Sequence, residues 1–194
     1  MKANRLISSA FGAILGALVA GPSLAADSAV IFMYHRFGDE RYPSTSIELE
    51  QFDAHLQEIE AGGYNVMPLP DIVAAFRRKE ALPDRTIAIT VDDAFLSLFE
   101  EGWPRLRKAG LPFTLFVATG AIDAGRPGYM SWSQIRELTT AGVTIGSQTS
   151  SHPHLPDVSD EQLAKELDDS NARFNDEIGY VPELLAYPFG EFGT

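Results

Sequence analysis

The chain contains no cysteine, and basic residues are scarce among its 194 residues. Without cysteine no disulfide can form, so the fold has to be stabilised by burial of a hydrophobic core. The chain carries 15 Lys and Arg against 27 Asp and Glu, which gives a net charge of −12. Such an acidic surface argues against nucleic acid or an anionic membrane as a partner, and it suits a neutral or cationic substrate.

Internal repeats, low-complexity tracts and linkers are also lacking. The length suits a single domain with a sizeable core and is short for two domains. Hydrophobic residues make up 45% of the chain and charged residues 22%, which is typical of globular proteins. We therefore expect one folded domain and no extensive disorder.

The N-terminus has the pattern of a secretory signal peptide, which we expect over residues 1–26. Lys2 and Arg5 precede the apolar stretch "LISSAFGAILGALVA", and Ser23 and Ala25 are small residues around a cleavage site. An uncleaved membrane anchor is the alternative. Cleavage leaves 13 Lys and Arg against 27 Asp and Glu, a net charge of −14. We expect an exported protein, periplasmic or extracellular, without stable membrane insertion.

From residue 29 onward, apolar runs alternate with amphipathic stretches. The runs predict strands over 29–37, 64–69, 85–93, 112–120, 143–149 and 182–190, the first of them buried. The amphipathic stretches predict helices over 49–64, 70–81, 97–109, 131–142 and 160–178. This alternation predicts an α/β fold for residues 27–194, with a mainly parallel sheet that is either open or closed into a barrel.

Polar side chains with chemical potential lie at the ends of the expected strands. His35 follows the first strand, Asp92 and Asp93 follow the third, and Gln148 and His152 follow the fifth. In parallel α/β folds the carboxyl ends of the strands converge on one face, where active sites gather. These strand ends together indicate a candidate active site.

Each of these motifs also has a structural interpretation. Asp92 and Asp93 could divide the work of base and cation ligand, provided the chain turns between them, or Asp93 could simply cap the next helix. His152 could bind a cation together with Gln148, or it could be a structural histidine. His35 could be a general acid or substrate contact, or a buried histidine bonded to a carboxylate.

Two further stretches allow the same choice. "AYPFG" (186–190) could offer backbone N–H groups to a developing oxyanion, or it could be a strand exit shaped by proline and glycine. Tyr129 and Trp132 could belong to the core, or they could stack on sugar rings if they are exposed.

Taken together, these motifs resemble the polysaccharide deacetylase (NodB homology) family over residues 29–194. The family's Thr-Phe-Asp-Asp-Gly stands here as "TVDDA" (90–94), and its His-Thr-x-x-His-Pro as "QTSSHP" (148–153), followed by "YPFG" (187–190). The early "MYHRF" (33–37) is similar to the branch that acts on exported poly-N-acetylglucosamine-type polymers.

The resemblance implies a distorted (β/α) barrel and metal-dependent hydrolysis of an N-acetyl or O-acetyl group, commonly with zinc. Carried over by position, Asp92 would be the general base that deprotonates water. Asp93 and His152 would be metal ligands, and Gln148 stands where the family has its other histidine. The backbone N–H of Phe189 would help to hold the oxyanion.

The sequence departs from the family in several places. Gln148 offers only an amide oxygen, which predicts weaker metal binding or a harder ion. Ala94 replaces a glycine, which matters only if that position needs a positive φ. The family's arginine near the third motif is absent. The later segments that usually supply a catalytic histidine are also missing, so we expect a fragment, or else His35 or His154 acts as general acid.

Three functions follow, from different classes. The leading one is a carbohydrate esterase that removes acetyl groups from an amino-sugar polymer. The alternatives are a catalytically silent glycan-binding domain of the same fold and an amidohydrolase acting on a small non-sugar amide. Asp92 favours the first over the second, because a binding domain has no need of a base beside a ligand carboxylate.

Overall fold

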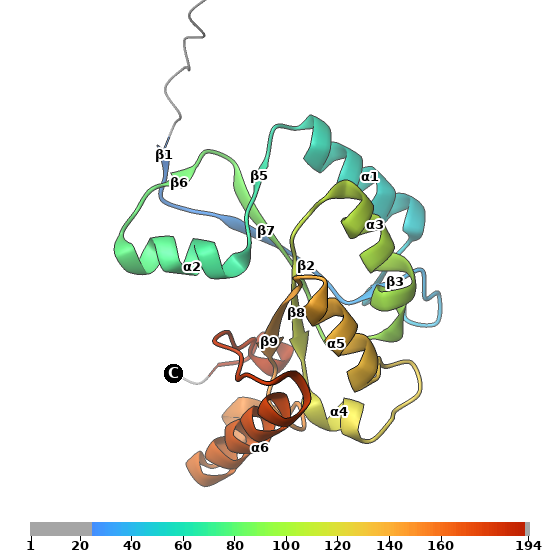
Figure 1. Ribbon diagram of the computed structural model, residues 1–194, viewed down its shortest axis with the longest axis vertical. Helices are drawn as coiled ribbons and strands as arrows, with labels where there is room; N and C mark the ends of the chain where they lie inside the picture. Colours follow the sequence, from blue (N-terminus) through green and yellow to red (C-terminus); the bar gives the residue numbers. More distant parts are fainter. Residues whose placement is uncertain (1–24, 193–194) are drawn as a thin grey trace, which may run out of the picture.

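Residues 25–192, which the computed structural model describes, form a twisted parallel sheet with helices on both faces (Figure 1). The main sheet has the order β2–β7–β8–β9, and β5 pairs with β7 off this path. The bounds of these strands are Val30–Tyr34 for β2, Asn65–Val66 for β5, Thr86–Val91 for β7, Thr114–Val117 for β8 and Thr144–Ser147 for β9. This confirms the expected α/β fold with a parallel sheet.

The strand β7 lies at the centre of this sheet. At Ile87 it pairs with both β2 and β5, so these two strands lie on opposite edges of β7. At Val91 it pairs with β2 and β8, so β5 and β8 follow one another along the same edge. Two short pairs lie outside the main sheet: β1 (Ala25–Ala26) with β6 (Leu82–Pro83), and β3 (Arg36–Phe37) with β4 (Ser46–Ile47).

Most of the helices lie close to where the sequence predicts them, but the short helix Thr119–Asp123 was not predicted and begins inside the strand expected over 112–120. Their bounds are Leu49–Ala61 for α1, Leu69–Arg78 for α2, Trp103–Ala109 for α3, Thr119–Asp123 for α4, Trp132–Thr140 for α5 and Asp160–Ile178 for α6. A π-helical turn (Leu98–Gly102) leads into α3, and 3-10 turns cover Leu155–Asp157 and Pro188–Gly190. Capping boxes at Ser131 and Ser159 start α5 and α6, because each serine accepts the N–H of the glutamine three residues on.

Each face of the sheet has its own hydrophobic core, because successive side chains of a strand point to opposite faces. Ile87 and Ile89 of β7 pack with the buried sides of α1, α3 and α5 in the larger core. Ala88 and Phe116 pack with α2 in the smaller one. Figure 1 shows this division, with α2 on one side of the strands and α1, α3 and α5 on the other.

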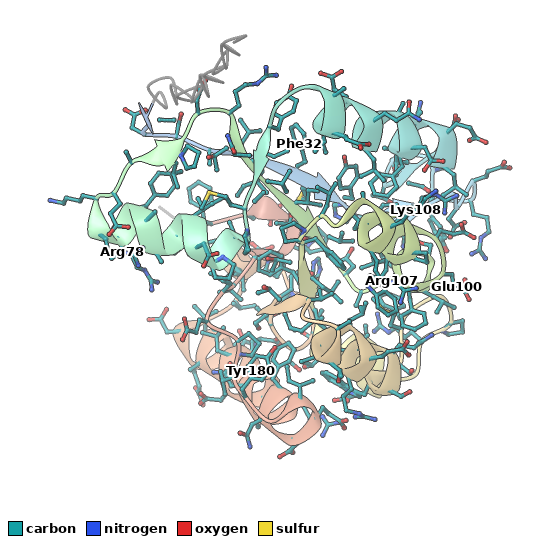
Figure 2. All side chains as sticks on the ribbon, turned by 45° about the horizontal axis from the view of Figure 1, so that its top comes forward. Phe32, Arg78, Glu100, Arg107, Lys108 and Tyr180 are labelled. Carbon is teal, nitrogen blue, oxygen red and sulfur yellow. The ribbon has the colours of Figure 1, made fainter. Side chains whose placement is uncertain are left out.

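Charged side chains lie on the outside of these layers. Figure 2 labels exposed residues of this kind on α2, the π-helical turn and α3: Arg78, Glu100, Arg107 and Lys108. Phe32 of β2, also labelled, is partly buried against the larger core. No helix within residues 25–192 combines the length and the hydropathy that crossing a membrane requires.

Two expectations about strands are wrong. The first strand was expected to be buried, yet Val30, Ile31 and Met33 are 55%, 51% and 59% exposed. Within residues 25–192, β2 pairs only with β7, so it is an edge strand despite its apolar sequence. The last strand, expected over 182–190, is reduced to a bridge between Ser147 and Leu185 followed by a 3-10 turn.

The loss of the last strand has a local cause. Pro188 has no N–H to donate to a ladder, and Phe189 adopts a φ of 58°, which ends extended backbone. The expected signal peptide, residues 1–26, lies outside the described residues except for Ala25–Ala26, so its cleavage stays a prediction.

Candidate active site

The parallel strands deliver the candidate residues to one edge of the sheet. His35 follows β2, Asp92 and Asp93 follow β7, and Gln148 follows β9. Hydrogen bonds extend the ladders beyond the strand ends, because the N–H of Asp92 donates to Tyr34 O at 2.9 Å and that of Gln148 to Val117 O at 2.9 Å. The side chains therefore start from a rigid framework.

The chain turns sharply after β7, which is the condition for both aspartates to serve one site. Asp93 has a φ of 71° and Ala94 a φ of 55°. Asp92 is buried, with 7% of its surface exposed. Burial raises the pKa of Asp92 to about 7, and the negative charge of Asp93 adds to this rise. A carboxyl group of this kind can accept and return a proton near neutral pH.

Asp93 connects the two halves of the site. Its Oδ1 lies 3.4 Å from Nε2 of His152, and its backbone N–H donates to Oε1 of the buried Gln148 at 3.3 Å. The capping interpretation of Asp93 does not hold, because the N-cap of the following helical turn is Ser97, without a side-chain hydrogen bond. Asp93 is thus available to a ligand or substrate.

His35 belongs to the same electrostatic group. Burial lowers its pKa, the charge of Asp93 opposes this effect, and Arg36 and His152 lower the pKa further. His35 directly follows Tyr34, whose carbonyl accepts the N–H of Asp92, so His35 lies beside the residues that follow β7. The structure therefore brings together His35 and the residues that follow β7 and β9.

Phe189 closes one side of the site with its ring. The ring packs edge-on against His152, with centroids 4.6 Å apart, and stacks on His154 at 4.0 Å. His154 itself is turned to Glu191, whose Oε2 lies 2.8 Å from its Nδ1. Of the two histidines suggested as general acid, His154 therefore contacts Glu191 and Phe189, which leaves His35 as the better candidate.

Strained backbone gathers at this edge of the sheet. The site residues Asp93, Ala94, Thr149, His152 and Phe189 all have positive φ values between 55° and 71°. Each such conformation in a non-glycine residue costs on the order of 1–3 kcal/mol and persists only where the surroundings impose it. Ala94 thus occupies a position where the glycine of the resembled motif would be unstrained.

The aromatic residues singled out by sequence have different roles. Trp132 belongs to the core: it packs against Phe174, and its Nε1 donates to Asp123 at 2.7 Å. Tyr129 is partly buried near the site. Burial, and then the negative charge of Asp93, raises its pKa. Its ring contacts Phe95 with centroids 4.8 Å apart.

Sequence reasoning missed residues that surround the site. Arg36 lies over the rings of Tyr42 and Phe95, at 4.1 and 3.4 Å from their centroids. Glu166 of α6 accepts hydrogen bonds from the loop that carries His152. Nothing in the local sequence distinguishes Glu166 from the other acidic residues of α6, so only the fold reveals its place.

Comparison with known proteins identifies the family. The family model described as "Polysaccharide deacetylase" matches residues 79–194, which is more than half of the chain and includes both motifs after β7 and β9. The chain belongs to the polysaccharide deacetylase family. YxkH of Bacillus subtilis (strain 168), which bears the family's name, is 24% identical over 162 residues, covering 84% of this chain and 57% of that protein.

More distant relatives of this chain include named enzymes. The poly-beta-1,6-N-acetyl-D-glucosamine N-deacetylase of Staphylococcus aureus (strain N315) is 20% identical over 171 residues, covering 82% of this chain and 59% of that enzyme. The chain thus spans 57–59% of the length of these curated relatives.

Solved structures agree on the fold of this family member. The Streptococcus pyogenes deacetylase PplD superposes with a TM-score of 0.77 and 22% identity, over 88% of this chain and 76% of that one. IcaB from Ammonifex degensii superposes with a TM-score of 0.74 and 26% identity, over 88% of this chain and 77% of that one.

Members of the family are typically metal-dependent, and the residues of this chain fit such an ion in part. Two ligands of one tetrahedral zinc ion lie about 3.4 Å apart, and the 3.4 Å between Asp93 Oδ1 and His152 Nε2 matches this spacing. Gln148 Oε1 accepts the backbone N–H of Asp93, and this amide oxygen carries no charge. No cluster of three His, Cys, Asp or Glu side chains able to hold a metal ion occurs among residues 25–192. Asp93 and His152 could therefore hold a divalent ion together, whereas Gln148 Oε1 already accepts the N–H of Asp93 and would be a weak third ligand.

Proposed function

We propose that the protein is exported and hydrolyses N-acetyl groups of an amino-sugar polymer. The observation that carries the proposal is the buried Asp92, with a pKa of about 7, beside the contact between Asp93 and His152. The distant similarity to a poly-beta-1,6-N-acetyl-D-glucosamine N-deacetylase supports this substrate class. The acidic chain, with a net charge of −12, suits a polymer that gains positive charge as amines are released.

In this proposal the ionised Asp92 accepts a proton from the water that attacks the acetyl carbonyl carbon. The C–N bond then breaks, acetate leaves, and the sugar nitrogen takes up a proton to become the free amine. We assign delivery of that proton to His35, which follows β2, the strand that pairs with β7. The protonated form of His35 is the one that can act as the acid.

Asp93, His152 and the amide oxygen of Gln148 would hold a divalent ion, with zinc as the first candidate. The chemistry that such an ion supplies is Lewis-acid activation of the amide carbonyl and of water. The backbone N–H of Phe189 takes no part in the hydrogen bonds that Gly190 and Glu191 make to Tyr187 and Pro188. It is therefore our candidate donor to the oxyanion.

Acetate release from N-acetylglucosamine oligomers tests this proposal. We expect release by the full chain with added Zn²⁺ at about pH 7–8, and release at least about a hundredfold lower in Asp92→Asn, because removal of a general base costs this much. Blank-level release by the folded wild-type chain would overturn the proposal.

A glycan-binding domain without catalysis is the second candidate, and the neutral Gln148 in the ligand set favours it. This candidate predicts oligomer binding that survives in Asp92→Asn and no release of acetate. Calorimetric titration with the same oligomers, beside the acetate assay, separates the two functions.

A further inference from the structure

The loop that presents His152, residues 148–152, is held in a strained conformation. Thr149 has a φ of 66° and His152 a φ of 58°. A β-branched residue such as Thr149 rarely adopts a positive φ, so the surrounding contacts have to impose it. The position of the His152 imidazole beside Asp93 depends on whatever maintains this conformation.

Glu166 of α6 makes the most concentrated set of contacts to this loop. Its Oε2 accepts the backbone N–H of Ser150 at 3.0 Å and that of Ser151 at 2.7 Å, and its Oε1 accepts the hydroxyl of Ser151 at 2.6 Å. Hydrogen bonds to an ionised acceptor are shorter and stronger than neutral ones. One carboxylate thus satisfies two adjacent backbone donors at the tip of the loop.

The helix that carries Glu166 is itself firmly placed. Phe174 is fully buried against Trp132, and Arg173 binds Asp123 at 2.9 Å. Ser170, one turn after Glu166 on the same face, is fully buried and lies 3.0 Å from the hydroxyl of Ser147. The α6 helix can therefore transmit a fixed position to the loop.

Other contacts reach only the rest of the loop. The N–H of Gly120 donates to Ser150 O at 2.8 Å, and the hydroxyl of Thr149 accepts the N–H of His152 at 3.2 Å. Neither contact satisfies the N–H groups of Ser150 and Ser151. Without the Glu166 carboxylate these two donors would turn to water, and the left-handed backbone would lose the support that offsets its strain.

We propose that Glu166 is the positioning residue for His152: by binding Ser150 and Ser151 it keeps the imidazole directed at Asp93. The proposal rests on the proposed function only in assigning His152 to the active site. Within residues 25–192 Glu166 makes no hydrogen bond or ion pair to His152 or Asp93, so it acts through the loop backbone. Outer partners of this kind typically change activity or metal affinity by about 10- to 100-fold when they are removed.

Nuclear magnetic resonance of the ¹⁵N-labelled histidines tests the proposal without substrate or metal. The chain has four histidines, which single substitutions assign. In Glu166→Ala we expect the His152 ring signals to broaden or split, and the amides of Ser150 and Ser151 to exchange at least about tenfold faster. His55 is the internal reference, because its Nδ1 lies 3.0 Å from the Tyr34 hydroxyl and makes no contact with this loop. We expect its signals to stay unchanged.

Asp168→Ala is the matched control, since it removes an exposed carboxylate from the same helix that makes no hydrogen bond or ion pair within the described residues. It should leave the His152 signals unchanged. Glu166→Gln, which keeps one oxygen acceptor, should fall between wild type and Glu166→Ala, and it carries the test if Glu166→Ala does not fold. Wild-type His152 signals and exchange rates in the folded Glu166→Ala protein, or in Glu166→Gln if only that variant folds, would overturn the proposal.

Kinetics give a second readout. For a deacetylase, Glu166→Ala should lower kcat by about 10- to 100-fold and change KM less than about threefold, because the substrate-binding surface stays intact. If the wild-type chain releases no acetate, the proposed function fails, while the His152 signals still decide the role of Glu166.

Discussion

Asp92 illustrates how position changes the chemistry of a common side chain. Two adjacent aspartates follow β7, and the burial of Asp92 raises its pKa to about 7. For an acid with a raised pKa, the native state binds the proton more tightly than the unfolded state. This stabilising effect is complete below the unfolded pKa of 3.8 and is lost as the pH rises through about 7.

Asp92→Asn should therefore change the pH dependence of stability. We expect its free energy of unfolding to exceed that of the wild type by on the order of 2–4 kcal/mol at about pH 8, because the ionised carboxylate is no longer buried. The difference should shrink towards about pH 4. Urea denaturation across this range measures it, and parallel curves for the two proteins would contradict the prediction.

Gln148→His should strengthen the binding of Zn²⁺ by at least about tenfold, because imidazole is a better ligand for zinc than an amide oxygen. Calorimetric titration of the metal-free protein with Zn²⁺ measures the change. Asp93→Asn in the Gln148→His background is the control, and it should weaken binding again. An unchanged affinity in Gln148→His would show that residue 148 does not face the ion.

For single residues, the sequence reveals which side chains follow the ends of strands, but it does not reveal which distant residues support them. His35, Asp92, Asp93, Gln148 and His152 could be predicted as a group because polar side chains after apolar runs mark the carboxyl edge of a parallel sheet. The raised pKa of Asp92 and the lowered pKa of His35 could not be predicted, since both depend on burial. Glu166 could not be predicted either, because its partners lie 15 and 16 residues away along the chain.

Among the elements, those with local signals match their predictions best. The helix α6 spans residues 160–178 as expected, because Ser159 and Gln162 form its capping box and Gly179 ends it with a φ of 82°. The strand expected over 182–190 is wrong, because hydropathy alone does not reveal the backbone turn at Phe189. The exposure of β2 was missed for a related reason: an apolar run does not show how many neighbours a strand has.

The strand β9 has a close approach that a single substitution can test. A Cβ at Gly146 would overlap the buried ring of Phe116 on β8. Gly146→Ala should lower the free energy of unfolding by about 1–3 kcal/mol through overpacking, as measured by urea denaturation.

The double variant Gly146→Ala/Phe116→Leu separates this clash from any general effect on β9. Leucine removes the ring atoms that the methyl group meets, so the double variant should be more stable than the sum of the single changes implies. Strict additivity would show that the two side chains do not interact.

Over the whole molecule, the sheet presents an apolar edge. Val30, Ile31 and Met33 are all more than half exposed on β2, which has no second neighbour among residues 25–192. Exposed apolar edge strands are common sites of association between chains, because their backbone N–H and C=O groups are free to pair.

Residues 27–194 should therefore associate with one another as the protein concentration increases. The variant Met33→Lys should shift the protein to the monomer with little change in Tm, since a charge blocks edge pairing. Sedimentation velocity at up to about 0.1 mM measures the effect. Gln57→Lys adds the same charge on the exposed face of α1 and should leave association unchanged. A wild-type chain that stays monomeric over this range would contradict the prediction.

The parallel connection of the strands has a kinetic consequence. The candidate site residues meet only after crossover segments have joined β2, β7, β8 and β9. Parallel strand pairs of this kind cannot form through short hairpins. Contacts of such long sequence separation form late and slowly during folding. The candidate active site should thus be the last part of the domain to mature. If the proposed activity holds, refolding followed by recovery of acetate release should lag behind refolding followed by helical circular dichroism.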